Sequence, residues 1–151
     1  MKIHELGHIV LYVRNLDRSR RFYKDVLGWD EIPGGTPAGF PAAAFTSGRT
    51  HHELLLIEVG ETAASIPSGR RVGMYHFGLK VGESDDELRE ALGALRDAGV
   101  EVLGASDHTV THSLYIADPD GNEVELYVDV VDRDVWSDPG AVLAPVRPLR
   151  L

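Results

Sequence analysis

One order of predicted elements, a strand, a helix and then three strands, occurs twice along the chain of 151 residues. Hydrophobic periodicity predicts the first set at 3–13, 18–27, 29–33, 40–47 and 52–59. The second set follows at 74–81, 85–98, 100–103, 109–116 and 122–128. A unit of about 65 to 70 residues is longer than the repeats of solenoid proteins, and it occurs only twice. The repeat predicts an α+β protein in which two paired βαβββ modules form an open barrel-like cup.

Cap residues mark both predicted helices. Asp17 precedes the first helix and Ser84 the second, and such side chains accept hydrogen bonds from the free N–H groups of the first turn. Gly28 and Gly99 follow the two helices, where glycine adopts the left-handed conformation at low cost. The apolar residues at 6–13 are interpreted as a nearly continuous buried strand.

A turn cluster at 118–122, Asp-Pro-Asp-Gly-Asn, joins the last two predicted strands as an antiparallel pair. A second turn, rich in proline and glycine, is predicted at 33–37. The final strand alternates between an apolar and a polar face, with Val124, Leu126 and Val128 on one and Glu123, Glu125 and Tyr127 on the other. Such a polar face either meets solvent or lines a water-filled cavity.

Composition excludes several classes of function. The net charge of -9 argues against nucleic acid as a partner, because phosphate binding needs a basic surface. Cysteine is absent, so any metal must be bound by histidine and carboxylate. No apolar run is long enough to span a bilayer, and the first residues enter a strand pattern without the features of a signal peptide. We therefore expect a cytoplasmic acidic globular protein with no membrane partner.

The predicted elements suggest one domain over 1–129. Its modules cover about 1–60 and 74–129, and a polar connector covers 61–73. The tail at 130–151 is irregular and rich in proline, and we expect it to pack on the domain or on a neighbouring subunit.

Three residues form a candidate metal site. His8 and His76 occupy matching places on the first strand of each module, and Glu125 lies on the polar face of the last strand. A lone histidine in a strand is usually a core residue, but two at repeat-related positions are also candidate ligands. Two imidazoles and one carboxylate on a redox-active ion leave positions open for a substrate and dioxygen. The residues alone leave both interpretations open.

The whole chain resembles the vicinal oxygen chelate superfamily, whose members pair βαβββ modules into a metal-binding cup. These members include extradiol ring-cleaving dioxygenases, glyoxalase I and antibiotic-resistance proteins. The stretch from Leu114 to Glu125, LYIADPDGNEVE, looks like the dioxygenase signature, in which a metal-binding glutamate comes ten residues after a tyrosine. Tyr115 and Glu125 have this separation, and His108 lies at the matching distance ahead of Leu114. The chain is most similar to small two-module catechol-2,3-dioxygenase-like proteins.

The resemblance implies a function and a metal. It implies Fe(II)-dependent extradiol cleavage of a small catechol-type aromatic by dioxygen, with His8, His76 and Glu125 as the metal ligands. Mn(II) could replace iron, because this ligand set does not separate the two ions. Many members of the superfamily dimerise, so we expect a homodimer.

The resemblance also implies roles for other side chains. His52, in the pair His51-His52, would be the acid/base, since imidazole titrates near neutral pH. His108 would hydrogen-bond the substrate or help to close the pocket. Tyr115 would hydrogen-bond the developing oxyanion or the metal-bound substrate oxygen. We expect no role for His112, which points away from the face of Tyr115.

Two alternatives remain open. In a glyoxalase I-like lyase that uses Ni(II) or Zn(II), Glu53 would be a fourth metal ligand. Glu53 and His52 are neighbours on a strand, so both can face the cup only if a bulge intervenes. The second alternative is a drug-binding resistance protein without enzymatic activity.

Overall fold

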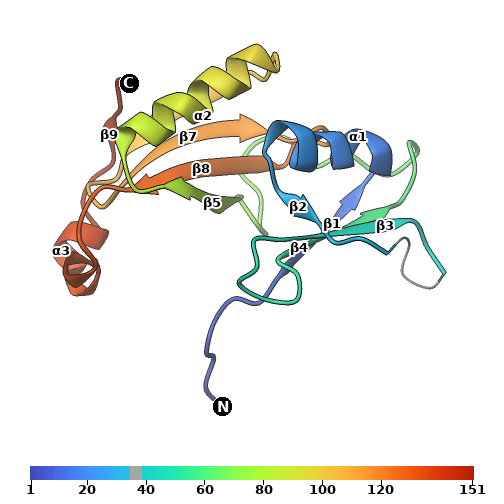
Figure 1. Ribbon diagram of the computed structural model, residues 1–151, viewed down its shortest axis with the longest axis horizontal. Helices are drawn as coiled ribbons and strands as arrows, with labels where there is room; N and C mark the ends of the chain where they lie inside the picture. The colour runs from blue at the N-terminus through green and yellow to red at the C-terminus, as the bar shows by residue number, and fades with distance from the viewer. Residues whose placement is uncertain (35–38) are drawn as a thin grey trace. The chain divides into compact units, whose positions relative to one another are not determined.

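The computed structural model describes residues 1–34 and 39–151 (Figure 1) and divides into two compact units, Met1–Ile66 and Pro67–Leu151. Each unit contains one βαβββ module, so the predicted α+β class and the two modules are confirmed. Most of the turn predicted at 33–37 lies outside the described residues.

The first module is a four-stranded sheet with one helical segment. Its strand order is β1-β4-β3-β2, in which β1 and β4 are parallel and the other neighbours are antiparallel. The elements are β1 (Ile9–Val13), α1 (Leu16–Arg20), a π-helix (Arg21–Val26), β2 (Asp30–Glu31), β3 (Ala42–Thr46) and β4 (Leu54–Glu58).

The first strand is shorter and less buried than predicted. β4 offers five residues for pairing, so only Ile9–Val13 has a partner, and the residues before it lie outside any strand. Within β1, Leu11 and Val13 are buried, whereas Val10 and Tyr12 are exposed. The interpretation of 6–13 as a continuous buried strand is therefore wrong, because only one face of β1 contributes to the core.

The first helix begins at a different cap from the one predicted. Asn15 has the extended backbone of a cap residue, and its side chain accepts a hydrogen bond from the backbone N–H of Arg18 at 2.9 Å. Asp17 lies inside the first turn instead, where its negative charge is favourable. Gly28 follows the helix at φ +71°, as predicted.

The second module repeats the topology of the first. Its strand order is β5-β8-β7-β6-β9, and again the first and last strands of the module, β5 and β8, are parallel neighbours. The elements are β5 (His76–Gly82), α2 (Asp85–Asp97), β6 (Val102–Asp107), β7 (Thr111–Ala117) and β8 (Glu123–Asp129). The tail adds a 3-10 helix (Arg133–Ser137), α3 (Pro139–Val142) and β9 (Arg147–Pro148), which pairs with β6.

Helix α2 covers one face of the second sheet (Figure 1). The predicted Ser84 cap is confirmed, since its side chain accepts from the backbone N–H of Glu87. Gly99 takes φ +70° just beyond the helix. Below α2 lie Val124, Leu126 and Val128, which are all buried, so the predicted apolar face of the last strand is confirmed. The opposite face of the sheet is left to polar side chains.

The turn at 118–122 sets the pairing of β7 with β8. One carboxylate oxygen of Asp118 accepts from the backbone N–H groups of Asp120 and Asn122, at 2.9 and 2.8 Å. Gly121 has φ +90°, which favours glycine. The predicted antiparallel pair is confirmed, and its register places Tyr115 directly opposite Glu125.

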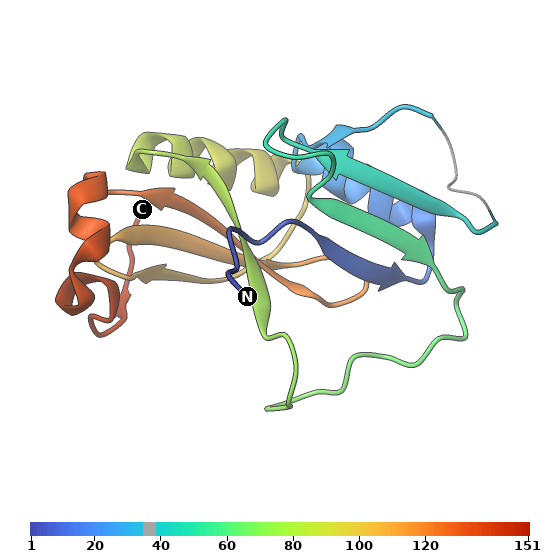
Figure 2. The same cartoon turned by 90° about the horizontal axis from the view of Figure 1, so that it is seen from below.

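The connector between the modules carries neither helix nor strand from Val59 to Tyr75 (Figure 2). In the two described ranges, every helix is too short or too polar to cross a membrane.

Candidate functional site

His76 and Glu125 lie side by side on the polar face of the second sheet. Their strands, β5 and β8, are parallel neighbours, and His76 Nε2 is 3.2 Å from a carboxylate oxygen of Glu125. The other ring nitrogen of His76, Nδ1, is 3.2 Å from a carboxylate oxygen of Glu123. His76 is thus held between two carboxylates of the same neighbouring strand.

This arrangement fits a divalent metal ion. Nitrogen and oxygen ligands bind such ions at about 2.0–2.2 Å, so two ligands at a right angle lie about 3 Å apart. His76 Nε2 and Glu125 have nearly this separation. Glu123 would fix the ring by accepting the Nδ1 proton, an arrangement that ligand histidines commonly have. Among the described residues of this module, no further histidine or carboxylate completes a three-ligand cluster.

Gly78 keeps the space beside this pair open. It lies opposite Glu125 in the β5–β8 register. A Cβ atom at Gly78 would lie 3.4 Å from a Glu125 carboxylate oxygen and 3.3 Å from the ring of Tyr127. The separation from the Tyr127 ring is tight and the carboxylate oxygen is already at contact distance, so a side chain larger than a methyl group at position 78 would meet Tyr127 and Glu125.

Tyr115 and His108 extend the site along the sheet. The Tyr115 hydroxyl donates to Glu125 at 3.2 Å, and His108 Nε2 lies 2.7 Å from the same hydroxyl oxygen. The phenol has one proton and gives it to Glu125, so His108 must donate its Nε2 proton to the phenol oxygen. Burial and the negative charge of Glu125 raise the pKa of Tyr115 to about 12, so the phenol stays protonated at neutral pH.

The remaining predicted histidines gather in the first module. The ring of His8 lies 4.5 Å from that of His52 and 6.1 Å from that of His51, measured between centroids. His51 and His52 share a hydrogen bond between their Nδ1 atoms, at 2.6 Å. Partial burial lowers the pKa of His52, and the nearby imidazoles of His51 and His8 lower it further. His52 is therefore neutral near pH 7, with a ring nitrogen able to accept a proton.

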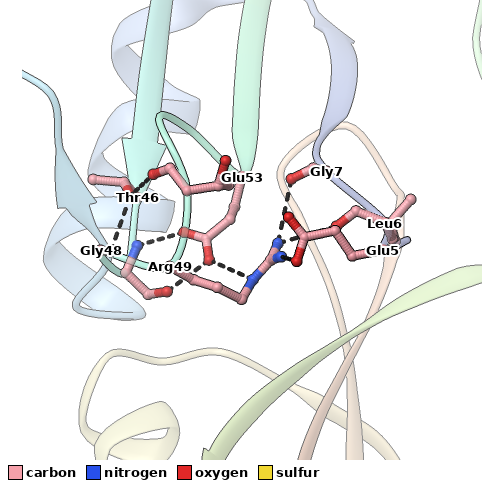
Figure 3. A network of polar contacts seen from close by, with 9 residues as sticks. Glu5, Leu6, Gly7, Thr46, Gly48, Arg49 and Glu53 are labelled. Carbon is pink, nitrogen blue, oxygen red and sulfur yellow. Dashed lines mark hydrogen bonds and ion pairs between the residues drawn. The ribbon is translucent and has the colours of Figure 1, made fainter. Parts of the chain in front are cut away.

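The carboxylate of Glu53 is occupied by hydrogen bonds within the first module (Figure 3). It accepts from the backbone N–H and the hydroxyl of Ser47 and from Nε of Arg49. Burial alone would raise the pKa of Glu53, but the hydrogen bonds from Ser47 and the charge of Arg49 outweigh it, and the pKa is lowered. This arrangement counts against Glu53 as a metal ligand, because its donors would have to be broken first.

Arg49 links Glu53 to the segment just before His8. Its guanidinium donates to the carbonyl oxygens of Leu6 and Gly7, both at 3.2 Å, and also pairs with Glu5 (Figure 3). The backbone next to His8 is therefore attached to the loop between β3 and β4, although it belongs to no strand.

Replacing Glu53 by glutamine is expected to lower the free energy of unfolding at pH 7 by about 1–3 kcal/mol, since hydrogen bonds to a charged group are lost. The native pKa of Glu53 lies below its ordinary value of 4.5, so its contribution is present above that value and is lost as the pH falls through the native pKa. Urea unfolding of the parent and Glu53→Gln should therefore differ at neutral pH and converge in acid.

The exposed Asp25 provides a matched control, and Asp25→Asn should leave the unfolding free energy nearly unchanged. A Glu53→Gln variant of equal stability at every pH would show that this network contributes nothing. Metal affinity should be unaffected by Glu53→Gln, whereas a glyoxalase-like site predicts that it falls.

The two modules differ at the position of Glu125, the candidate metal ligand. Leu55 pairs with the residue two places after His8. Glu125 pairs with the residue two places after His76. Leu55 is thus the counterpart of Glu125, and the first module has an apolar residue where the second has a carboxylate. Only the second module brings a histidine and this carboxylate together.

Sequence reasoning did not assign Glu123 a role at the site. The sequence did contain a signal for Glu123, because Glu123 shares the polar face of β8 with Glu125. Once β5 is the parallel neighbour of β8, both carboxylates lie beside β5. The link from Arg49 to the segment before His8 had no such signal, because Leu6 and Gly7 lie more than forty residues away in the chain. His112 bonds to Asp85 of α2 at 2.6 Å, on the face opposite Tyr115, as predicted.

Comparison with known proteins adds a family and several named relatives. A family model described as the Glyoxalase/Bleomycin resistance protein/Dioxygenase superfamily matches residues 5–126. The chain is 34% identical over 137 residues to a catechol-2,3-dioxygenase of Bacillus subtilis, covering 89% of this chain and 45% of that protein. It is 35% identical over 127 residues to biphenyl-2,3-diol 1,2-dioxygenase 3 of Rhodococcus globerulus, covering 82% and 63%. The chain thus spans only about half of these relatives.

Solved structures show the same fold. A glyoxylase/bleomycin resistance protein/dioxygenase domain from Frankia sp. EAN1pec aligns with a TM-score of 0.69 at 23% identity, covering 85% of this chain and all of that one. A lactoylglutathione lyase from Agrobacterium tumefaciens aligns with a TM-score of 0.63 at 25% identity, covering 91% and 99%.

Proposed function

We propose that this chain, which belongs to the Glyoxalase/Bleomycin resistance protein/Dioxygenase superfamily, is an extradiol dioxygenase. It uses Fe(II) to cleave a catechol-type aromatic. The relatives from Bacillus subtilis and Rhodococcus globerulus are named as dioxygenases of aromatic diols. The observation that carries the proposal is the 3.2 Å separation of His76 Nε2 and Glu125, beside a protonated phenol. We assign His8 as the third ligand, and Mn(II) is the metal that could replace iron.

The side chains of this chain have distinct tasks in the proposed reaction. When bound, Fe(II) supplies the transfer of electron density between the diol and dioxygen, which protein side chains do not provide. Tyr115 keeps its proton at neutral pH and donates it to Glu125 in this structure. With a diol bound, the same proton would turn from Glu125 to an oxygen of the diol as negative charge develops there. His108 orients that hydroxyl by donating to its oxygen. We assign His52 as the base that accepts a proton from a diol hydroxyl, because its imidazole is neutral.

The proposal is favoured over a glyoxalase-like lyase by the state of Glu53. A lyase with a fourth carboxylate ligand would use this side chain, which is held by Ser47 and Arg49. The likeness to a lactoylglutathione lyase is a likeness of fold and does not supply that ligand.

The proposal is tested by loading the metal-free protein with Fe(II) under anaerobic conditions and exposing it to catechols in air. We expect a yellow ring-cleavage product and consumption of one dioxygen per diol, both lost in His76→Ala. The lyase would replace the proposal if two results were found together. The Fe(II) and Mn(II) proteins would cleave no catechol, and the Ni(II) or Zn(II) protein would isomerise a methylglyoxal–glutathione hemithioacetal. If ligand binding is unchanged after metal removal and no turnover is found, the protein is a binding protein without enzymatic activity.

A further inference from the structure

The second module has a groove that begins at Glu125 and continues to the C-terminal tail. Its volume is about 500 Å³, which is within the range of small-molecule sites. The sheet contributes Lys80, Tyr127 and Asp129, and the tail contributes Arg133, Trp136 and Val142. Figure 1 shows the tail helix α3 at the end of this sheet. The groove therefore connects the proposed metal ligand Glu125 with an aromatic and apolar wall.

The acidic groups of this groove already have partners. The ammonium group of Lys80 lies 2.6 Å from Asp129 and 2.9 Å from Glu83. Glu125 accepts from Tyr115 and lies beside His76. A cationic ligand would have to compete with these contacts, so the carboxylates do not favour an amine.

Arg133 is the charged group of the groove without an acidic partner among the described residues. Its guanidinium lies 5.2 Å from the centre of the Trp136 ring, a cation–π contact that leaves its N–H donors available. Trp136 is 43% exposed, so its surface is open to a ligand. A planar guanidinium beside an aromatic surface is suited to a carboxylate on a ring, because it binds both carboxylate oxygens at once.

We propose that this groove binds an aromatic acid, with the ring against Trp136 and Tyr127 and the carboxylate on Arg133. This inference rests on the proposed function. The substrate is then a catechol that carries a carboxylate side chain, and the diol end of the substrate lies at Glu125. A neutral catechol would fill the apolar wall but would leave Arg133 without its partner.

The test uses the metal-free protein, so that binding at Arg133 is measured apart from ring cleavage. The chain has two tryptophans, and Trp29→Phe leaves Trp136 as the only tryptophan reporter. Phenylacetate and its neutral isostere phenylacetamide are titrated against Trp136 fluorescence. We expect saturable binding of phenylacetate that is weakened about tenfold or more in Arg133→Gln, since a charge-assisted hydrogen bond is lost. The weaker binding of phenylacetamide should hardly change.

Arg96→Gln is the matched control, because Arg96 is exposed at the end of α2 and should not alter the binding of phenylacetate. Equal binding of acid and amide, an Arg133→Gln variant with full affinity for the acid, preference for phenethylamine, or no binding at all would each overturn the proposal.

The iron-loaded protein separates the two proposals. We expect KM for 3,4-dihydroxyphenylacetate to lie below that for 4-methylcatechol, and Arg133→Gln to remove the difference while kcat is retained. Selective binding of phenylacetate without any ring cleavage would remove the dioxygenase and keep the aromatic-acid site. Ring cleavage without selectivity for the acid would remove the aromatic-acid site and keep the dioxygenase.

Discussion

Replacing Glu125 by glutamine is expected to weaken Fe(II) binding by more than about a hundredfold and to abolish ring cleavage, since even groups that only orient metal ligands cost 10–100-fold. The amide has nearly the size of the carboxylate but lacks its charge, so the hydrogen bond from Tyr115 can persist while the anionic ligand is lost. Metal affinity can be measured by calorimetry with Fe(II) under anaerobic conditions, or with Mn(II) by electron paramagnetic resonance. Unfolding in urea should change little in the absence of metal.

Two further carboxylates give graded controls for Glu125→Gln. Glu123→Gln removes the charged acceptor of the His76 Nδ1 proton, and we expect metal affinity to fall about 10–100-fold. Glu90 is exposed on α2, so Glu90→Gln should leave affinity and turnover unchanged. Normal metal affinity in Glu125→Gln would show that the 3.2 Å pair with His76 is only a polar contact of the sheet.

Replacing Leu88 by alanine is expected to lower the free energy of unfolding by about 2–5 kcal/mol, the cost of a large-to-small change in a well-packed core. Leu88 lies on α2 and is fully buried on the side of the helix that packs across β5, β7 and β8. Urea unfolding followed by circular dichroism measures the change. Val72→Ala is the control, because Val72 is fully exposed in the connector and its truncation should change the free energy by less than about 0.5 kcal/mol.

Measuring the metal affinity of Leu88→Ala tests whether the two faces of the second sheet act separately. Leu88 lies on the helix-covered side, whereas Glu125 is on the polar face. Folded Leu88→Ala protein should therefore retain Fe(II) affinity within a few-fold. A destabilisation below about 1 kcal/mol would contradict the packing of α2 described above.

Local signals predicted much of the second module correctly. Ser84 and Gly99 mark the ends of α2 because capping and the left-handed conformation depend on a few neighbouring residues. The turn at 118–122 behaves in the same way. The prediction failed at β1, which is short because its distant partner β4 is short. It also failed at the cap of α1, which is Asn15 and not Asp17 because the extended backbone lies at Asn15.

The chain's own pattern determined the α+β class, the two βαβββ modules and the polar face that carries Glu125, because alternation and helical spacing are properties of neighbouring residues. The resemblance to a known family singled out Tyr115, whose spacing from Glu125 spans one hairpin. Only the tertiary structure decided that His76 is held between Glu123 and Glu125, since this depends on the parallel pairing of strands about fifty residues apart. It likewise decided that Arg49 meets the carbonyl oxygens of Leu6 and Gly7, and that Arg133 and Trp136 line one groove with Lys80. Side-chain direction and charge pairing follow from register and packing, which no local pattern contains.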